Sequence, residues 1–165
     1  MSGHADNTIV ILMGDHGYQL GEKDRLGKAA VWRCASRTPL VIRMPGGPTG
    51  KTDQAVSLID IFPTLIEILG LEAPQPLDGT SLIPLLQDPT SKRRAPAVIT
   101  STSGRQIGVV RFPWHYISYD DGSVELYDHS VDPGEINNLL AVDGASQKYQ
   151  GVIKRLAKHI PGNRK

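Results

Sequence analysis

The apolar run from Thr8 to Met13, with the sequence TIVILM, most constrains what this chain can fold into. The run is short, continuous and rich in β-branched residues, which is typical of a strand buried on both faces of a parallel sheet. It is followed closely by Asp15, His16 and Gly17. Ligands bind at the carboxyl ends of strands in open α/β sheets. The sequence therefore predicts a ligand-binding site at the end of this strand, where the carboxylate and the imidazole lie.

Further elements of the first portion follow from its punctuation. Residues 39–44, PLVIRM, predict a second strand that begins at a proline and ends in a turn cluster. Asp60 is expected to cap a helix that runs to Leu69, and Gly70 is the natural stop. These elements predict an α/β portion over residues 1–95.

The pattern changes after Pro96. Alternating segments separated by turns predict a small antiparallel meander, and apolar residues at helical spacing predict a last helix over about residues 146–160. The expected strands are 107–110, 114–119 and 124–127. We therefore expect a second, antiparallel subdomain with a terminal helix over residues 96–165.

Composition excludes several classes of function. The chain has 165 residues, 39% of them hydrophobic and 21% charged, with a formal net charge of +1. Such a balance is that of a globular protein and gives no global field for nucleic acid. No apolar run is long enough to span a membrane, and no signal peptide is visible, so the compartment stays open. A single cysteine excludes an internal disulfide.

Asp15 and His16 are candidate metal ligands. Oxygen-rich coordination would favour a hard divalent cation such as calcium. The alternative is that Asp15 caps a turn and that His16 packs against the following loop, because the tripeptide alone is a weak motif.

Two basic residues are candidate anion contacts. Lys28 follows Gly27 and precedes two alanines, so its ammonium can approach a sulfate or phosphate oxygen closely. The alternative for Lys28 is an ordinary surface lysine. Arg37, just before the second strand, either pairs with a buried carboxylate or only flanks the strand.

Two other reactive side chains are weaker candidates. Arg33 and Arg37 would lower the pKa of Cys34, but no His/Asn constellation for a catalytic thiol is evident. His115 lies in an alternating segment and is expected to be a satisfied sheet residue rather than a ligand.

Several motifs occur in register along the chain. They are Asp15-His16-Gly17, Leu20-Gly21-Glu22, Gly27-Lys28, Arg37-Thr38-Pro39 and ELYDHSVDPGEINNL at residues 125–139. At these spacings the chain resembles the sulfatase family of the alkaline phosphatase-like superfamily, and most closely the branch that holds iduronate-2-sulfatase and choline sulfatase. The resemblance implies the C-terminal part of an alkaline phosphatase-like sheet, with a small antiparallel sheet and a C-terminal helix.

The resemblance also implies roles for individual residues. Asp15 and His16 match positions that bind the single calcium ion, and Lys28 matches the lysine that contacts the sulfate group of a sulfate ester. Arg37 is a further candidate substrate contact. Many members of this branch carry a histidine after Leu-Gly-Glu, whereas this chain has Lys23 and Asp24 there, so the substrate contacts of this loop are open.

Family members use a formylglycine nucleophile made from Cys or Ser in a Cys/Ser-x-Pro-x-Arg motif, and no such motif occurs in this sequence. We therefore expect a C-terminal fragment that is inactive alone and that self-associates through apolar surface left without its normal partner. The alternatives are a related phosphonate or phosphate ester hydrolase and a non-catalytic fragment that only binds or assembles.

Overall fold

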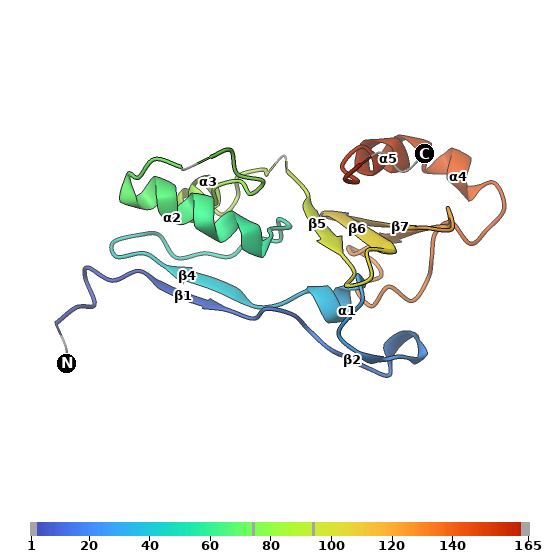
Figure 1. The fold of residues 1–165 in the computed structure, drawn as a ribbon, viewed down its shortest axis with the longest axis horizontal. Coiled ribbons are helices and arrows are strands. Elements are labelled where there is room, and N and C mark those ends of the chain that lie inside the picture. Colours follow the sequence, from blue (N-terminus) through green and yellow to red (C-terminus); the bar gives the residue numbers. More distant parts are fainter. Residues whose placement is uncertain (1–2, 74, 94, 163–165) are drawn as a thin grey trace. The chain divides into compact units, whose positions relative to one another are not determined.

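A computed structural model describes residues 3–73, 75–93 and 95–162 of the chain (Figure 1). The chain forms two compact units. The first comprises residues up to Asp15 together with Thr38–Ala95, and the second comprises His16–Arg37 together with residues from Pro96 onward. The boundary near residue 95 stays a prediction about domains, while residues 16–37 belong by their contacts to the second unit.

The first unit contains a two-stranded ribbon. Strand β1 (Val10–Met13) pairs antiparallel with β4 (Leu40–Arg43), and Ile11 lies opposite Ile42. Both predicted strands are confirmed, but the expected burial of the first strand on two faces of a parallel sheet is wrong within this chain. Leu12 is 63% exposed, because β4 is the only strand that pairs with β1 among the described residues.

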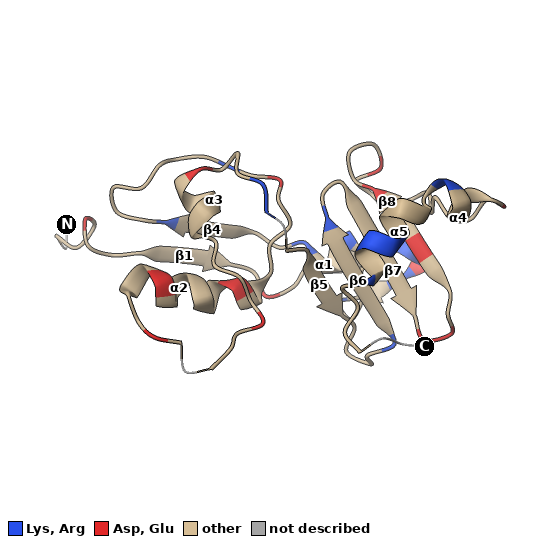
Figure 2. Cartoon of the chain, turned by 90° about the horizontal axis from the view of Figure 1, so that it is seen from above, with Lys and Arg blue, Asp and Glu red and all other residues tan. Residues whose placement is uncertain are grey.

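Two helices accompany the ribbon. Both lie on one side of it in Figure 1, and seen from above in Figure 2 they lie toward its opposite edges. The 3-10 turn η2 (Leu58–Asp60) leads into α2 (Ile61–Leu69), and α3 (Ile83–Gln87) follows. Gly70 ends α2 in the left-handed conformation, as predicted.

The capping contacts at the start of this helix differ from the prediction. Ser57 and Asp60 form a capping box, in which the backbone N–H of Ser57 donates to the Asp60 carboxylate. Asp60 lies at the N-cap position of α2, as predicted, but its side chain makes no capping hydrogen bond to that helix. Its buried carboxylate also receives the backbone N–H of Thr80 and pairs with Arg93 at 2.8 Å, so it joins three segments of the first unit.

The second unit is built on a four-stranded antiparallel sheet in the order β5-β6-β7-β8. The predicted meander is confirmed, and one further strand precedes it. The strands are β5 (Ala97–Thr100), β6 (Gln106–Arg111), β7 (Trp114–Tyr119) and β8 (Val124–Asp128).

The two faces of this sheet carry separate cores. Alternation along β7 directs Tyr116 to one face, where Val109, Leu126 and Leu156 form a cluster. Leu156 comes from helix α5 (Gln150–Ala157), which follows α4 (Ala145–Lys148) and forms the predicted terminal helix.

The other face is covered by residues 16–37. Val31 and Trp32 from this segment pack with Ile117 of β7 and Tyr127 of β8. The segment contains β2 (Gln19–Leu20), the 3-10 turn η1 (Glu22–Asp24), β3 (Leu26–Gly27) and α1 (Arg33–Ser36). Residues 16–37 therefore form a small hairpin followed by one helical turn. No helix in the described parts of the chain is long and apolar enough to cross a membrane.

We expect the chain to self-associate through the exposed apolar side chains of the β1–β4 ribbon, since Val10, Leu12 and Val41 are all about half exposed or more. Leu12→Lys should shift sedimentation toward the monomer at high protein concentration. Lys51→Glu, a charge change at another exposed position of the first unit, is the control. A wild-type chain that stays monomeric over the whole concentration range, with a melting temperature independent of concentration, would contradict the expectation.

Candidate functional site

His16 and Lys28 are brought together by the hairpin of the second unit. The register pairs Gln19 with Gly27, so the residues that flank the hairpin lie side by side. Lys28 Nζ lies 3.0 Å from His16 Nε2, and both residues are exposed. Two candidates from separate sequence motifs are thus in direct contact.

The hairpin is seated on α1 by a close backbone approach. The N–H of Gly17 donates to the carbonyl of Ala35 at 2.7 Å, and a Cβ at Gly17 would lie only 2.2 Å from the carbonyl oxygen of Cys34. Only glycine fits at this position. Gln19 is buried beside it, and its side chain donates to the carbonyl of Glu22. The glycine of the Asp-His-Gly motif therefore sets the path of the chain that carries His16.

Two contacts of His16 fit the tautomer that carries its proton on Nδ1. Its Nδ1 lies 2.8 Å from the carbonyl oxygen of Gly17, which can only accept, so Nδ1 carries the proton. Nε2 then holds a lone pair, which here receives the Lys28 ammonium. A metal-bound histidine is held in the same way, with its second nitrogen donating to a backbone carbonyl. His16 therefore fits a metal ligand, and Asp15 supplies the kind of oxygen that hard cations prefer.

The other candidate residues are placed individually. Asp15 is exposed and closes the first segment of the first unit, directly before His16 in the chain. Arg37 is exposed and follows α1, where its backbone N–H donates to the carbonyl of Arg33. Among the described residues, Arg37 forms no ion pair with a buried carboxylate.

Cys34 differs from the sequence expectation. Burial raises the pKa of its thiol, and the charges of Glu22 and Glu135 raise it further. The expectation that this pKa is lowered is therefore wrong, because desolvation and the two carboxylates raise it. A protonated thiol is a poor nucleophile.

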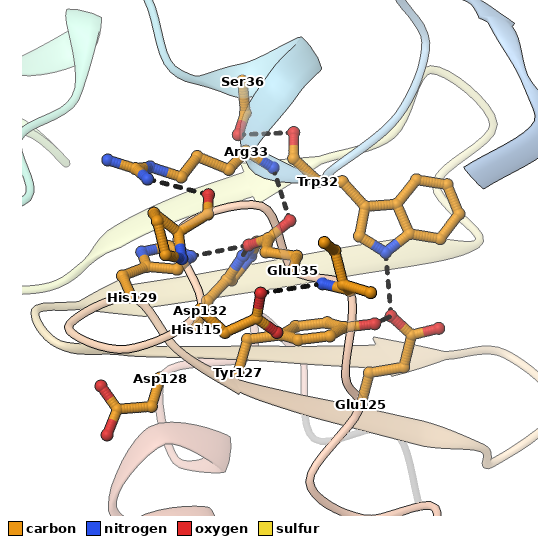
Figure 3. Close-up of polar contacts among 12 residues, drawn as sticks. Trp32, Arg33, Ser36, His115, Glu125, Tyr127, Asp128, His129, Asp132 and Glu135 are labelled. Carbon is orange, nitrogen blue, oxygen red and sulfur yellow. Dashed lines mark hydrogen bonds and ion pairs between the residues drawn. The ribbon is translucent and has the colours of Figure 1, made fainter. Parts of the chain in front are cut away.

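A buried cluster of two histidines and one glutamate in the second unit was not predicted from the sequence (Figure 3). Glu135 Oε1 lies 2.5 Å from His115 Nδ1 and 2.7 Å from His129 Nε2. Its other oxygen receives the backbone N–H of Arg33 at 2.8 Å, at the start of α1. We call these four groups the Glu135 latch. It joins β7, the turn after β8 and the segment that carries His16 and Lys28.

The donor set of the latch, two imidazoles and one carboxylate, is one that zinc accepts. The surroundings of the second nitrogen of His115 favour hydrogen bonds over metal coordination. If a metal took Nδ1, the proton would move to Nε2, which is buried without a hydrogen-bond partner among the described residues. A Cβ on Gly108 would lie 2.7 Å from this nitrogen, so the backbone leaves no room for an acceptor there. His115 is thus a buried sheet residue that donates to Glu135.

The latch stabilises the ionised form of Glu135. Burial raises the pKa of this carboxyl group, but the hydrogen bonds from His115 and His129 outweigh burial and bring the pKa from 4.5 to about 2. A carboxyl whose pKa is lower in the folded state stabilises the fold above its unfolded pKa. This contribution is lost as the pH falls from about 4.5 toward about 2.

We expect Glu135→Gln to lower the free energy of unfolding at pH 7 by about 1.5–3 kcal/mol, since it removes hydrogen bonds to a charged group. The deficit should shrink as the pH falls below about 4.5, which urea denaturation over a pH series would measure. Glu67→Gln, at an exposed position of α2, is the control and should be nearly neutral. An equal deficit at pH 7 and pH 3 would show that the charge of Glu135 is not what stabilises the latch.

Comparison with known proteins identifies the family. The family model described as "N-sulphoglucosamine sulphohydrolase, C-terminal" matches residues 21–165. A "Sulfatase" of Formosa agariphila is 35% identical over 97% of this chain and 31% of its own length. "Arylsulfatase K" of Bos taurus is 31% identical over 92% of this chain and 32% of its own length. The chain therefore spans about a third of the curated relatives it matches.

Solved structures agree with these relatives. The structure of BT4656 in complex with its substrate D-glucosamine-2-N,6-O-disulfate is 25% identical, with a TM-score of 0.72, and the match covers 99% of this chain and 37% of that chain. The phosphonate monoester hydrolase of Agrobacterium radiobacter is 28% identical, with a TM-score of 0.74, over 94% of this chain and 35% of that chain. The fold class expected from the motifs is confirmed, and this chain belongs to the sulfatase family, matching its C-terminal portion.

Proposed function

We propose that this chain is the C-terminal portion of an enzyme that hydrolyses sulfate esters, and that Lys28 contacts the sulfate group. The observation that carries the proposal is the contact between Lys28 Nζ and His16 Nε2, 3.0 Å apart on an exposed hairpin. An ammonium held at a fixed place is a compact charge for a sulfate oxygen. Developing negative charge on that oxygen would be stabilised more than the charge of the bound ester, which favours reaction.

We propose that Asp15 and His16 hold a calcium ion in the complete enzyme. Such an ion would act as a Lewis acid on the sulfate oxygens. The imidazole is prepared for this role because its Nδ1–H donates to the carbonyl of Gly17, which leaves Nε2 as the ligand atom. A bound ion would take the Nε2 lone pair of His16, which would leave the Lys28 ammonium to contact the ester. Arg37 is proposed as a further substrate contact, on the basis of its place before β4.

The nucleophile of the proposed reaction is a formylglycine, and this chain carries no motif from which one is made. Its single cysteine lies in the sequence Cys34-Ala35-Ser36-Arg37-Thr38, which has no proline in the third place. Burial and nearby carboxylates also keep this thiol protonated, since they raise its pKa. The isolated chain is therefore proposed to be inactive.

The substrate class is proposed from the relatives. An N-acetylglucosamine-6-O-sulfatase of Bacteroides thetaiotaomicron is 30% identical over 93% of this chain. The structure with a bound glucosamine disulfate covers nearly the whole chain as well. We therefore propose a sulfated sugar as the substrate. The two motif features, Asp15-His16 and Leu20-Gly21-Glu22, support the iduronate-2-sulfatase and choline sulfatase branch.

A phosphonate or phosphate ester hydrolase is the second candidate. It is favoured by the likeness to two phosphonate monoester hydrolases, at 28% and 26% identity with TM-scores of 0.74 and 0.73. An ammonium and a divalent ion serve a phosphoryl oxygen as well as a sulfuryl oxygen. The family model and the curated sulfatases favour the sulfate ester.

We expect the pure chain to bind inorganic sulfate weakly at Lys28 and to show no turnover of an aryl sulfate. Addition of sodium sulfate should move the NMR signals of Lys28 and His16, and Lys28→Ala should abolish these shifts. Lys148→Ala, a lysine on α4, is the control and should leave them unchanged. Turnover that Lys28→Ala abolishes would refute the proposed inactivity, whereas sulfate shifts that survive Lys28→Ala would refute the role of Lys28.

A further inference from the structure

The turn between β2 and β3 has a backbone conformation that its residues disfavour. Lys23 has φ 58° and Asp24 has φ 53°, so two consecutive residues with side chains adopt the left-handed region. This region is disfavoured for L-residues, and glycine usually occupies it. Such conformations persist only where the surroundings hold them. Contacts from other parts of the chain must therefore hold this turn.

The side chain of Lys23 is anchored on the sheet of the second unit. Its Nζ donates to the hydroxyl of Tyr127 at 2.8 Å and lies 4.6 Å from the centre of the Tyr127 ring. It also lies 5.6 Å from the centre of the Trp32 ring. One ammonium thus makes a hydrogen bond and contacts the faces of two aromatic side chains, a combination that stabilises a partly desolvated cation.

The hydroxyl of Tyr127 passes this interaction on to Glu125. It donates to Glu125 Oε2 at 2.7 Å, and Trp32 Nε1 donates to the same oxygen at 2.8 Å (Figure 3). Tyr119 donates to Oε1 at 2.9 Å. Burial raises the pKa of Tyr127, and its hydrogen bond to Glu125 raises it further, so the hydroxyl keeps its proton. Lys23 and Glu125 are therefore linked by two hydrogen bonds through the Tyr127 hydroxyl.

This bridge fixes the end of the hairpin that precedes Lys28. The ladder of β2 and β3 is only two residues long on each strand, too short to define its own position. At the turn, the N–H of Gly21 donates to the carbonyl of Arg25, and the N–H of Leu20 donates to the Glu22 carboxylate. These contacts shape the turn itself, whereas the contacts of Lys23 join the turn to β8.

We propose that Lys23 is a positioning residue, which places Lys28 against His16 by holding the turn on the sheet. The proposal rests on the proposed function only in so far as Lys28 is the sulfate contact. Lys23 itself is not expected to contact the sulfate, because its ammonium is already occupied by Tyr127 and the two rings. Lys23, which directly follows Leu20-Gly21-Glu22, thus acts through the hairpin rather than on the substrate.

The test compares Lys23→Met with Arg25→Met in the full chain. Arg25 is the matched control, because its guanidinium also lies 5.6 Å from the Trp32 ring but the side chain is exposed. In Lys23→Met, the amides of Gly21 and Arg25 should exchange with deuterium roughly 5–30-fold faster, as a loss of one or two kcal/mol implies. The nuclear Overhauser contact between the His16 ring and the Lys28 side chain should also weaken.

Further variants separate positioning from loss of folding. Tyr127→Phe keeps the ring and removes the bridging hydroxyl, so it should reproduce part of the effect, and Lys23→Arg should restore protection. The Gly17 amide, which donates to Ala35, and the amides of β6 and β7 should keep their exchange rates in all variants. Two results would overturn the proposal. In the first, Lys23→Met leaves the amide protection of the turn and the His16–Lys28 contact unchanged. In the second, Arg25→Met loses both to the same extent as Lys23→Met.

A sulfate titration distinguishes this inference from the proposed function. If the wild-type chain shows no sulfate shifts but Lys23→Met loses the His16–Lys28 contact, the positioning role stands and the sulfate contact falls. If sulfate moves the Lys28 signal equally in wild type and Lys23→Met, the positioning role falls while the sulfate contact stands.

Discussion

The packing of residues 30–35 against one face of the four-stranded sheet is the constraint on which the second unit depends. Val31 is completely buried there, and Trp32 and Ala35 lie beside it against Ile117 and Tyr127. Apolar burial alone is not directional. Direction comes from two carboxylates, because Glu125 receives the Trp32 indole N–H and Glu135 receives the Arg33 backbone N–H. One apolar contact and two charged acceptors therefore fix both the depth and the register of this segment.

This arrangement explains how an exposed pair can be well placed. His16 and Lys28 lie on the solvent side of a hairpin that has little structure of its own. The hairpin is held at Gly17, which touches α1, and at Lys23, which reaches β8. Both supports depend on the buried segment after Lys28, because Gly17 contacts Ala35 and Lys23 contacts Trp32. Precision at a surface site thus depends on groups that never meet a ligand, as is general for functional sites on loops.

Local patterns in the sequence predicted much of the fold, and the motifs named His16 and Lys28, which lie in contact. Alternation and a turn signal located β7 and β8, and Gly70 marked the end of α2. The burial of β1 could not be predicted in the same way. The apolar strand Val10–Met13 is suited to pack against partners on both faces, but the sequence does not say whether those partners are present. Ser57 was missed as the start of the capping box because Asp60 carries an equally good capping side chain.

The least predictable features are the polar contacts between distant residues. Lys23 and Tyr127 are 104 residues apart, and Arg33 and Glu135 are 102 residues apart. No periodicity signals such a pair, because a lysine in a charged loop and a tyrosine in a strand each have a sufficient local explanation. A weak trace exists in the motifs themselves. ELYDHSVDPGEINNL contains Glu125, Tyr127, His129 and Glu135, which are the acceptors and donors that hold the segment carrying His16 and Lys28. The closing motif of the chain is thus the physical support of its opening motifs, although their residues are far apart in the sequence.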